Sequence, residues 1–290
     1  MTTAYTHLIS VAQLQQLQAQ GAPLMVFDCS FNLFDPAEAD THFAQAHIAG
    51  SRQAHLERDL SAASGAPALS GGRHPLPERE AFAAWLRSQG FDNDMQAIVY
   101  DRNGLNFCGR LWWMLKWAGH DAVAVLDGGL QAWQAAGGAV QGGPAPAPAR
   151  AGNFTLGQPL RRLRSQAEVA AHLADGTQTL IDGRAAARYR GEVEPLEPAA
   201  GHIPGALNRP FGDNLDANGL FKSAEVLRSE LQTLLAGRPA PQELVCYCGS
   251  GVSTVPNIIA LELAGYESPV MYAGSWSEWT RTPGAEIEKG

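Results

Sequence analysis

One cysteine of this sequence stands where its side chain could act as a nucleophile. Cys248 follows an apolar run, 244–247, and a helical pattern begins at 255. In the intervening loop, CGSGVS (248–253), glycines let backbone N–H groups turn inward into an anion-binding nest, and the helix adds its positive N-terminal end. Such a nest favours a thiolate, and it would equally stabilise a second sulfur carried on Cys248. We expect the transferred group to contact Gly249, Gly251, Val252 and Ser253.

The alternative is a buried, inert cysteine in a glycine-rich turn, which is the commoner situation for an isolated C-G-S-G. The order strand, loop and helix favours the reactive cysteine instead. A Cys-x5-Arg phosphatase also has such a loop, but that chemistry needs an arginine six residues after the cysteine. Thr254 stands at that position, so the sequence excludes this reaction.

An internal repeat places Cys248 in the second of two similar halves. Four segments recur in the same order, roughly 150 residues apart. Chance similarity would not preserve this order, so the chain is a duplicated unit. The paired residues that mark the four segments are Asp28 with Asp182, His47 with His202, Tyr100 with Tyr247, and Trp133 with Trp279.

The repeat predicts a domain at 1–138 and a second at 157–290. They are joined by a Pro/Ala/Gly-rich linker, 139–156, whose alternating prolines favour an extended spacer. Apolar runs alternate with helical periodicity in each half, which predicts an α/β fold with a mostly parallel sheet flanked by helices. Ligands of such sheets bind at the carboxyl ends of the strands, where Cys248 lies.

Composition excludes several classes of function. Of the 290 residues 45% are hydrophobic and 17% charged, and the net charge is -8 without any basic block, which argues against nucleic-acid binding. No apolar run reaches membrane-spanning length, and the first residues lack a secretory pattern. We therefore expect a cytoplasmic protein whose four cysteines are free thiols.

The sequence resembles the tandem-domain rhodaneses of the sulfurtransferase family over nearly its whole length. The motifs that carry the resemblance are DGRAAARYRGEVEP (182–195), GHIPGALNRPF (201–211), CGSGVS (248–253) and YAGSWSEW (272–279). The resemblance implies a catalytic second domain with a persulfide on Cys248 and a silent first domain. Asp101 stands at the position of the lost nucleophile, and Arg184 is expected to pair with Asp182. The resemblance implies no metal and no organic cofactor.

The same resemblance bears on the sulfur donor. Neutral loops like this one are typical of 3-mercaptopyruvate sulfurtransferases, whereas arginine and lysine after the cysteine are typical of thiosulfate enzymes. Arg188 matches the family's substrate arginine, and Arg190 is a second candidate. The family's further arginine, in a stretch like E-P-x-P-R, is missing from EPLEPAAGH (194–202). The prediction is a small anionic donor, with 3-mercaptopyruvate favoured and thiosulfate as the alternative.

In mercaptopyruvate enzymes a similar H-x-L-P histidine joins the loop serine and an aspartate in a proton relay. His74 and Ser250 match this pattern and Asp59 is the candidate aspartate, although His74 could also merely cap its loop. The persulfide would then pass its sulfur to a thiol such as reduced thioredoxin, or to cyanide. The non-enzymatic alternative is a persulfide carrier or redox-sensing module that uses Cys246 and Cys248.

Overall fold

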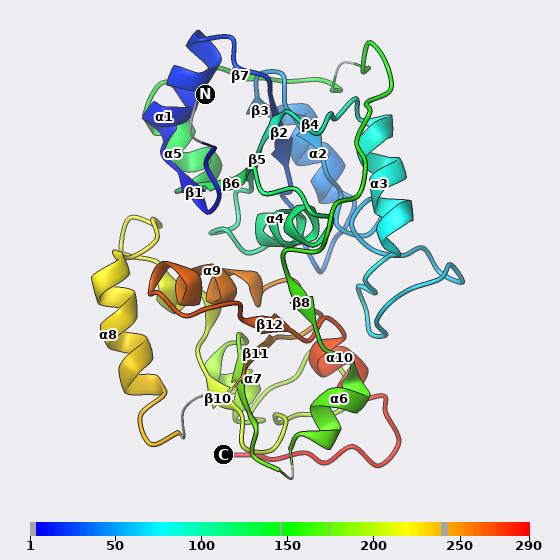
Figure 1. Ribbon diagram of the computed structural model, residues 1–290, viewed down its shortest axis with the longest axis vertical. Coiled ribbons are helices and arrows are strands. Elements are labelled where there is room, and N and C mark those ends of the chain that lie inside the picture. Colours follow the sequence, from blue (N-terminus) through cyan, green and yellow to red (C-terminus); the bar gives the residue numbers. More distant parts are fainter. Residues whose placement is uncertain (1–3, 146, 174, 239–242) are drawn as a thin grey trace. The chain divides into compact units, whose positions relative to one another are not determined.

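The computed structural model describes residues 4–145, 147–173, 175–238 and 243–290 (Figure 1). Within those four ranges no helix combines the length and apolar character that crossing a bilayer requires. The chain forms two compact units, and each unit includes a short segment from the other half of the sequence. The N-terminal unit comprises Met1–Pro67, Pro77–Leu160 and Asn218–Leu220, and the C-terminal unit comprises Ala68–Leu76, Arg161–Ala217 and Phe221–Gly290.

A parallel five-stranded sheet with the order β1-β6-β5-β2-β4 forms the centre of the N-terminal unit. A short antiparallel pair, β3 with β7, accompanies it. The strands are β1 (Leu8–Ile9), β2 (Leu24–Asp28), β3 (His47–Ile48), β4 (Arg52–Gln53), β5 (Gln96–Tyr100), β6 (Val123–Leu126) and β7 (Val140–Gln141). The helices are α1 (Val11–Ala19), α2 (Glu38–Gln45), α3 (Arg79–Ser88), α4 (Cys108–Trp117) and α5 (Gly129–Ala135).

The sheet of the C-terminal unit is also parallel, with the order β10-β9-β11-β12-β8. Read from its other edge, this sheet has the same strand order as the first: β8, β12, β11, β9 and β10 correspond to β1, β6, β5, β2 and β4. The structure therefore confirms the predicted fold and the duplication. The strands are β8 (Arg162–Leu163), β9 (Gln178–Asp182), β10 (Leu207–Asn208), β11 (Glu243–Tyr247) and β12 (Val270–Met271). The helices are α6 (Gln166–Ala171), α7 (Ala186–Tyr189), α8 (Ala224–Leu234), α9 (Val255–Leu263) and α10 (Ser275–Trp279), with a 3-10 turn at Phe211–Asn214.

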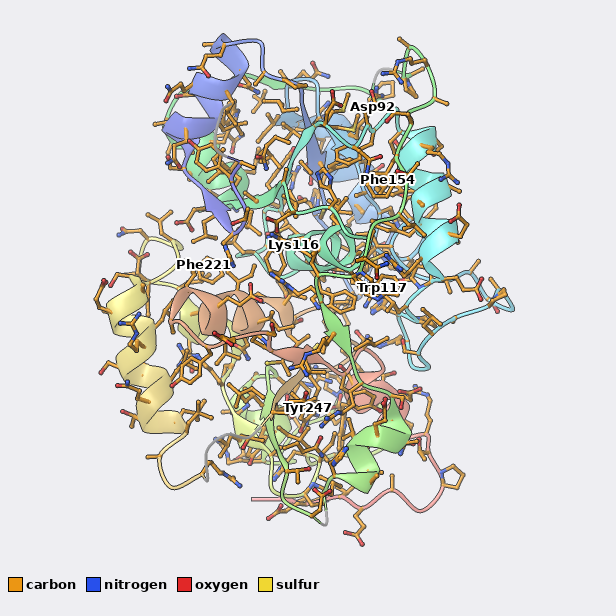
Figure 2. The ribbon with its side chains drawn as sticks, in the orientation of Figure 1. Asp92, Lys116, Trp117, Phe154, Phe221 and Tyr247 are labelled. Atoms are coloured by element: carbon orange, nitrogen blue, oxygen red, sulfur yellow. The ribbon has the colours of Figure 1, made fainter. Side chains whose placement is uncertain are left out.

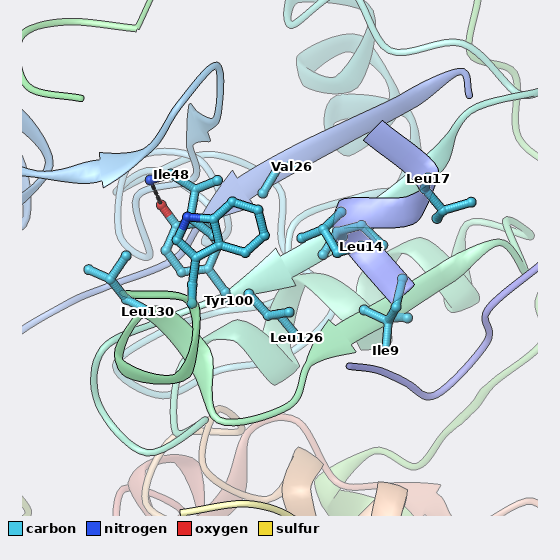
Figure 3. Close-up of a cluster of buried hydrophobic side chains, with 11 residues drawn as sticks. Ile9, Leu14, Leu17, Val26, Ile48, Tyr100, Leu126 and Leu130 are labelled. Carbon is cyan, nitrogen blue, oxygen red and sulfur yellow. Dashed lines mark hydrogen bonds between the residues drawn. The ribbon is translucent and has the colours of Figure 1, made fainter. Parts of the chain in front are cut away.

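The core of the N-terminal unit shows why these runs become strands with helices on both faces. Alternate side chains of β2 point to opposite sides, so Val26 packs with Leu14 and Leu17 of α1 (Figure 3). Phe27, on the other side, packs against Trp85 of α3. The Tyr100 hydroxyl accepts the N–H of Ile48 at 2.9 Å within the same cluster (Figure 3). Buried apolar faces of this kind hold the strand ends, and therefore the loops that follow them, in fixed positions.

The predicted linker, 139–156, is not a free spacer along its described length. Pro146 lies outside the described residues. Strand β7 pairs with β3, and Phe154, labelled in Figure 2, is fully buried with its ring 5.8 Å from that of Phe91. Proline and alanine keep the segment extended, but the buried side chain of Phe154 binds it to the N-terminal unit. The compact units accordingly divide at Leu160 and Arg161.

Candidate active site

Cys248 directly follows β11, and the loop 248–254 leads from it into α9. The first turn of α10 fixes this loop through backbone groups: Trp276 N–H donates to the Cys248 carbonyl at 3.0 Å, and Ser277 N–H donates to the Gly249 carbonyl at 2.8 Å. Ser275 Oγ accepts the N–H of Cys248 itself at 3.1 Å. Cys248 is therefore held at the carboxyl end of a central strand, where the sequence places it.

The glycines of the loop have different roles. Gly251 has a φ of +73°, and a Cβ added there would lie 2.1 Å from the Ala273 carbonyl oxygen, so only glycine fits. A Cβ at Gly249 would meet nothing closer than 3.5 Å, and its nearest neighbours are guanidinium nitrogens. Val252 is buried and accepts the N–H of Val255 at 3.3 Å, whereas Ser253 is partly exposed. The loop therefore has no room for a side chain at Gly251, whereas the space beside Gly249 is open.

The equivalent loop of the N-terminal unit shows what such a backbone binds. The Asp101 carboxylate, fully buried, accepts four backbone N–H groups at 2.8–2.9 Å. Burial raises the pKa of Asp101, and these N–H groups oppose the rise because they stabilise the charged form. The loop of the N-terminal unit is therefore an anion nest occupied by its own carboxylate. The donors are Asn103, Leu105, Phe107 and Cys108.

Backbone hydrogen bonds confirm that Asp101 and Cys248 are equivalent positions. Leu130 N–H donates to the Asp101 carbonyl at 3.1 Å, as Trp276 N–H does to the Cys248 carbonyl at 3.0 Å. The glycine three residues further on has a positive φ in both loops, +70° at Gly104 and +73° at Gly251. The interpretation of Asp101 as the residue at the lost nucleophile's position is therefore confirmed by geometry.

The other three cysteines are in environments that keep them as thiols. Cys29, Cys108 and Cys246 are fully buried, and desolvation raises the pKa of each well above that of an exposed cysteine. All four cysteines are free. Within the described part of the chain, no three His, Cys, Asp or Glu side chains gather as metal ligands would.

His74 and Ser250 lie in hydrogen-bond contact although 176 residues separate them: His74 Nδ1 is 2.7 Å from Ser250 Oγ. Both are buried, with exposures of 2% and 5%. The segment Ala68–Leu76, which carries His74, belongs to the C-terminal unit by its contacts. The structure thus brings together two of the three predicted relay residues next to Cys248.

Asp59, the third predicted relay residue, lies in the N-terminal unit. Its carboxylate accepts the N–H of His55 at 2.8 Å and is 3.7 Å from Arg58 Nε. It lines a cavity of about 260 Å³ together with Trp85, and burial raises the pKa of its carboxyl group. These contacts of Asp59 lie within the N-terminal unit, so its part in the relay stays a prediction.

The predicted substrate arginines are placed differently. Arg188 lies beside the loop, with Nη1 3.5 Å from the Cβ position of Gly249, and it forms a two-pronged pair with Glu194 at 2.6 and 3.2 Å. Arg190 forms a solvent-exposed pair with Glu192, which raises the pKa of the guanidinium. Arg184 binds Asp182 at 2.6 Å and is buried, which confirms its structural interpretation.

Three residues near Cys248 were not identified from the sequence. Glu194 holds Arg188, Ser275 accepts the Cys248 N–H, and Arg73 lies beside Gly249. Arg73 directly precedes His74, so the relay motif itself is a signal that could have indicated it. Ser275 has a φ of +55°, which serine adopts only under strain, and no sequence pattern indicates that.

Comparison with known proteins agrees with this geometry. A model of the rhodanese-like domain matches residues 10–136 and again 165–282. A probable 3-mercaptopyruvate sulfurtransferase of Pseudomonas aeruginosa is 45% identical over 97% of this chain and 100% of its own. A putative thiosulfate sulfurtransferase of Mycobacterium tuberculosis, SseB, is 35% identical over 98% of this chain and 97% of its own.

Among solved structures, SseA of Escherichia coli, a 3-mercaptopyruvate sulfotransferase, is 28% identical. It superposes with a TM-score of 0.77 over 94% of this chain and 100% of its own. The two family matches coincide with the two equivalent sheets and with the paired loops at Asp101 and Cys248. This chain therefore belongs to the rhodanese-like family and contains two copies of its domain, of which only the second retains the loop cysteine.

Proposed function

We propose that this chain is a sulfurtransferase that takes the thiol sulfur of 3-mercaptopyruvate onto Cys248, where it becomes the outer, sulfane sulfur of a persulfide. The observation that carries the choice of donor is the 2.7 Å contact between His74 and Ser250 in the Cys248 loop. Loss of sulfur from mercaptopyruvate leaves a pyruvate enolate, which needs a proton, whereas sulfite leaving from thiosulfate does not. A buried histidine–serine pair beside the nucleophile is a suitable general acid for that enolate.

The anion nest around Asp101 is an argument for the covalent intermediate on Cys248, because the two loops are equivalent. In the N-terminal unit four N–H groups surround a carboxylate at the position equivalent to Cys248. The same loop geometry around Cys248 would stabilise the anionic terminal sulfur of a persulfide, because backbone dipoles are fixed and need no reorganisation. A carrier or sensor would need the same nest but no proton donor, so the His74–Ser250 pair favours an enzyme.

The reaction proceeds in two displacements. The Cys248 thiolate attacks the sulfur of mercaptopyruvate, the S–S bond forms, the C–S bond breaks, and its electron pair becomes the enolate. The enolate takes up a proton through Ser250 and His74 and leaves as pyruvate, and the donor's thiol proton restores the relay. Arg188 binds the donor carboxylate, and Arg190, although paired with Glu192, is the second candidate for that contact. Asp59 stays the candidate aspartate of the relay, as the family resemblance implies.

The second displacement regenerates the enzyme. A thiolate acceptor such as reduced thioredoxin, or cyanide, attacks the outer sulfur of the persulfide, and Cys248 leaves as a thiolate stabilised by the nest. No electron carrier or metal takes part in either displacement. We place the reaction in the cytoplasm, where thiol acceptors are reduced and free cysteines persist.

A direct comparison of donors tests the proposal. We expect kcat/KM to be higher with mercaptopyruvate than with thiosulfate, and mass spectrometry should find one extra sulfur on the peptide that contains Cys248. Thiosulfate is the second candidate, since the M. tuberculosis relative is named for it and residues 194–202 contain no arginine. A higher kcat/KM with thiosulfate would overturn the choice of donor, and a persulfide without turnover of either donor would indicate a carrier.

A further inference from the structure

The short helix α10, which fixes the nucleophile loop through its backbone N–H groups, also holds the relay histidine. Two of its side chains, Ser277 and Glu278, accept hydrogen bonds from the segment that carries His74. Arg73 N–H donates to Ser277 Oγ at 2.9 Å, and Gly71 N–H donates to Glu278 Oε1 at 2.7 Å. One helix therefore fixes both the loop of the nucleophile and the segment of the histidine.

The segment Ala68–Leu76 is closed by hydrogen bonds within itself. Leu69 N–H donates to the Leu76 carbonyl at 2.8 Å, and Leu76 N–H donates to Ser70 Oγ at 2.9 Å. His74 lies inside this closed loop, so a displacement of Gly71 displaces the His74 backbone with it. A bond that fixes Gly71 consequently limits where the His74 ring can lie.

The Glu278 carboxylate lies in a site that is closely shaped to it. A Cβ added at Gly274 would overlap Glu278 Oε2, and a Cβ added at Gly72, whose φ is +86°, would lie 2.8 Å from the Gly274 carbonyl oxygen. Tyr272 lies near the same carboxylate, because burial raises the pKa of its hydroxyl and the charge of Glu278 raises that pKa further. The two glycines thus let the segment lie directly against the helix, with the carboxylate at one fixed place.

We propose that Glu278 is a positioning residue of the proton relay, because it holds Gly71 and thereby keeps the His74 ring at hydrogen-bond distance from Ser250. That contact is 2.7 Å long, and a shift of the segment by about 1 Å is enough to break it. The inference rests on the proposed function, because it assumes that His74 and Ser250 protonate the pyruvate enolate. Loss of Glu278 should therefore slow the reaction of mercaptopyruvate and spare that of thiosulfate, which needs no proton.

The test measures, in single turnovers, pyruvate release from mercaptopyruvate and sulfite release from thiosulfate. We expect Glu278→Ala to slow pyruvate release about 10- to 100-fold and sulfite release by less than about 3-fold. Glu278→Gln should restore pyruvate release to within about 3-fold of wild type, because its amide oxygen accepts the same N–H. The matched control is Glu286→Ala, which removes an exposed carboxylate of the same unit and should change neither rate.

A second substitution separates positioning of the histidine from a general loss of structure. In a His74→Ala background, Glu278→Ala should slow pyruvate release no further, since the group that it positions is already absent. Further slowing in that background, or equal slowing with both donors in Glu278→Ala alone, would overturn the inference. Glu278→Asp is the second variant in case Glu278→Ala does not fold. It keeps the charge but is one CH₂ shorter, so it should show the same donor-selective loss, and wild-type pyruvate release in it would also overturn the inference.

The His74→Ala variant also distinguishes this inference from the proposed function. If His74→Ala released pyruvate at the wild-type rate, the relay and the choice of donor that rests on it would fail. A donor-selective loss in His74→Ala, together with a wild-type rate in Glu278→Ala, would refute the role of Glu278 alone.

Discussion

Replacing Asp101 by alanine separates the structural role of the silent loop from catalysis. The substitution removes a carboxylate that accepts four buried N–H groups at 2.8–2.9 Å. A hydrogen bond to a charged group contributes about 1.5–3 kcal/mol, so the four together contribute roughly 6–12 kcal/mol. Burying one carboxylate costs several kcal/mol, which offsets part of this sum. We expect the free energy of unfolding to fall by about 2–5 kcal/mol.

Urea unfolding followed by tryptophan fluorescence measures this loss. Five of the seven tryptophans lie in the N-terminal unit, so the signal reports on the unit that carries Asp101. For a domain of this size the loss corresponds to a fall in Tm on the order of 10 °C. Asp94→Ala, at an exposed carboxylate of the same unit, is the control and should leave both values unchanged.

Sulfur transfer by the folded Asp101→Ala variant should stay within about 3-fold of wild type, because the reacting atoms are on Cys248. An unfolding midpoint equal to that of wild type would refute the reasoning that the carboxylate fills an anion nest. A loss of turnover as large as that of a nucleophile variant, with the fold intact, would show that the first half is not silent.

Four further substitutions probe the C-terminal half. Cys248→Ser should abolish transfer, whereas Cys246→Ser should keep most of it; an extra sulfur on Cys246 after donor treatment would reassign the nucleophile. Ser250→Ala should reduce kcat with mercaptopyruvate more than with thiosulfate, because only the former leaves an enolate to protonate, and equal losses with both donors would exclude the relay. Arg188→Ala should cost about 1.5–3 kcal/mol in kcat/KM for mercaptopyruvate, mostly through KM, and a change confined to kcat would contradict a carboxylate contact.

Periodicity and loop composition were sufficient to predict much of the fold and the position of Cys248. The apolar run at 244–247 is part of β11, which begins one residue earlier, and the helical pattern from 255 is α9. These features are local, because a strand of alternating buried residues and a glycine-rich turn are determined by neighbours in the chain. The repeat added the equivalence of Asp101 and Cys248, since both copies keep the same order of segments.

The surroundings of Cys248 depended on contacts between distant parts of the chain. His74 meets Ser250, and Arg73 reaches Gly249, only because Ala68–Leu76 packs with the C-terminal unit. Glu197, which the sequence analysis did not single out, is a buried acceptor for two arginines. Periodicity reports which face of an element is buried, but not which remote side chain lies against it. The sequence by itself therefore determined the fold and predicted the nucleophile, while the tertiary structure decided which charges lie beside it.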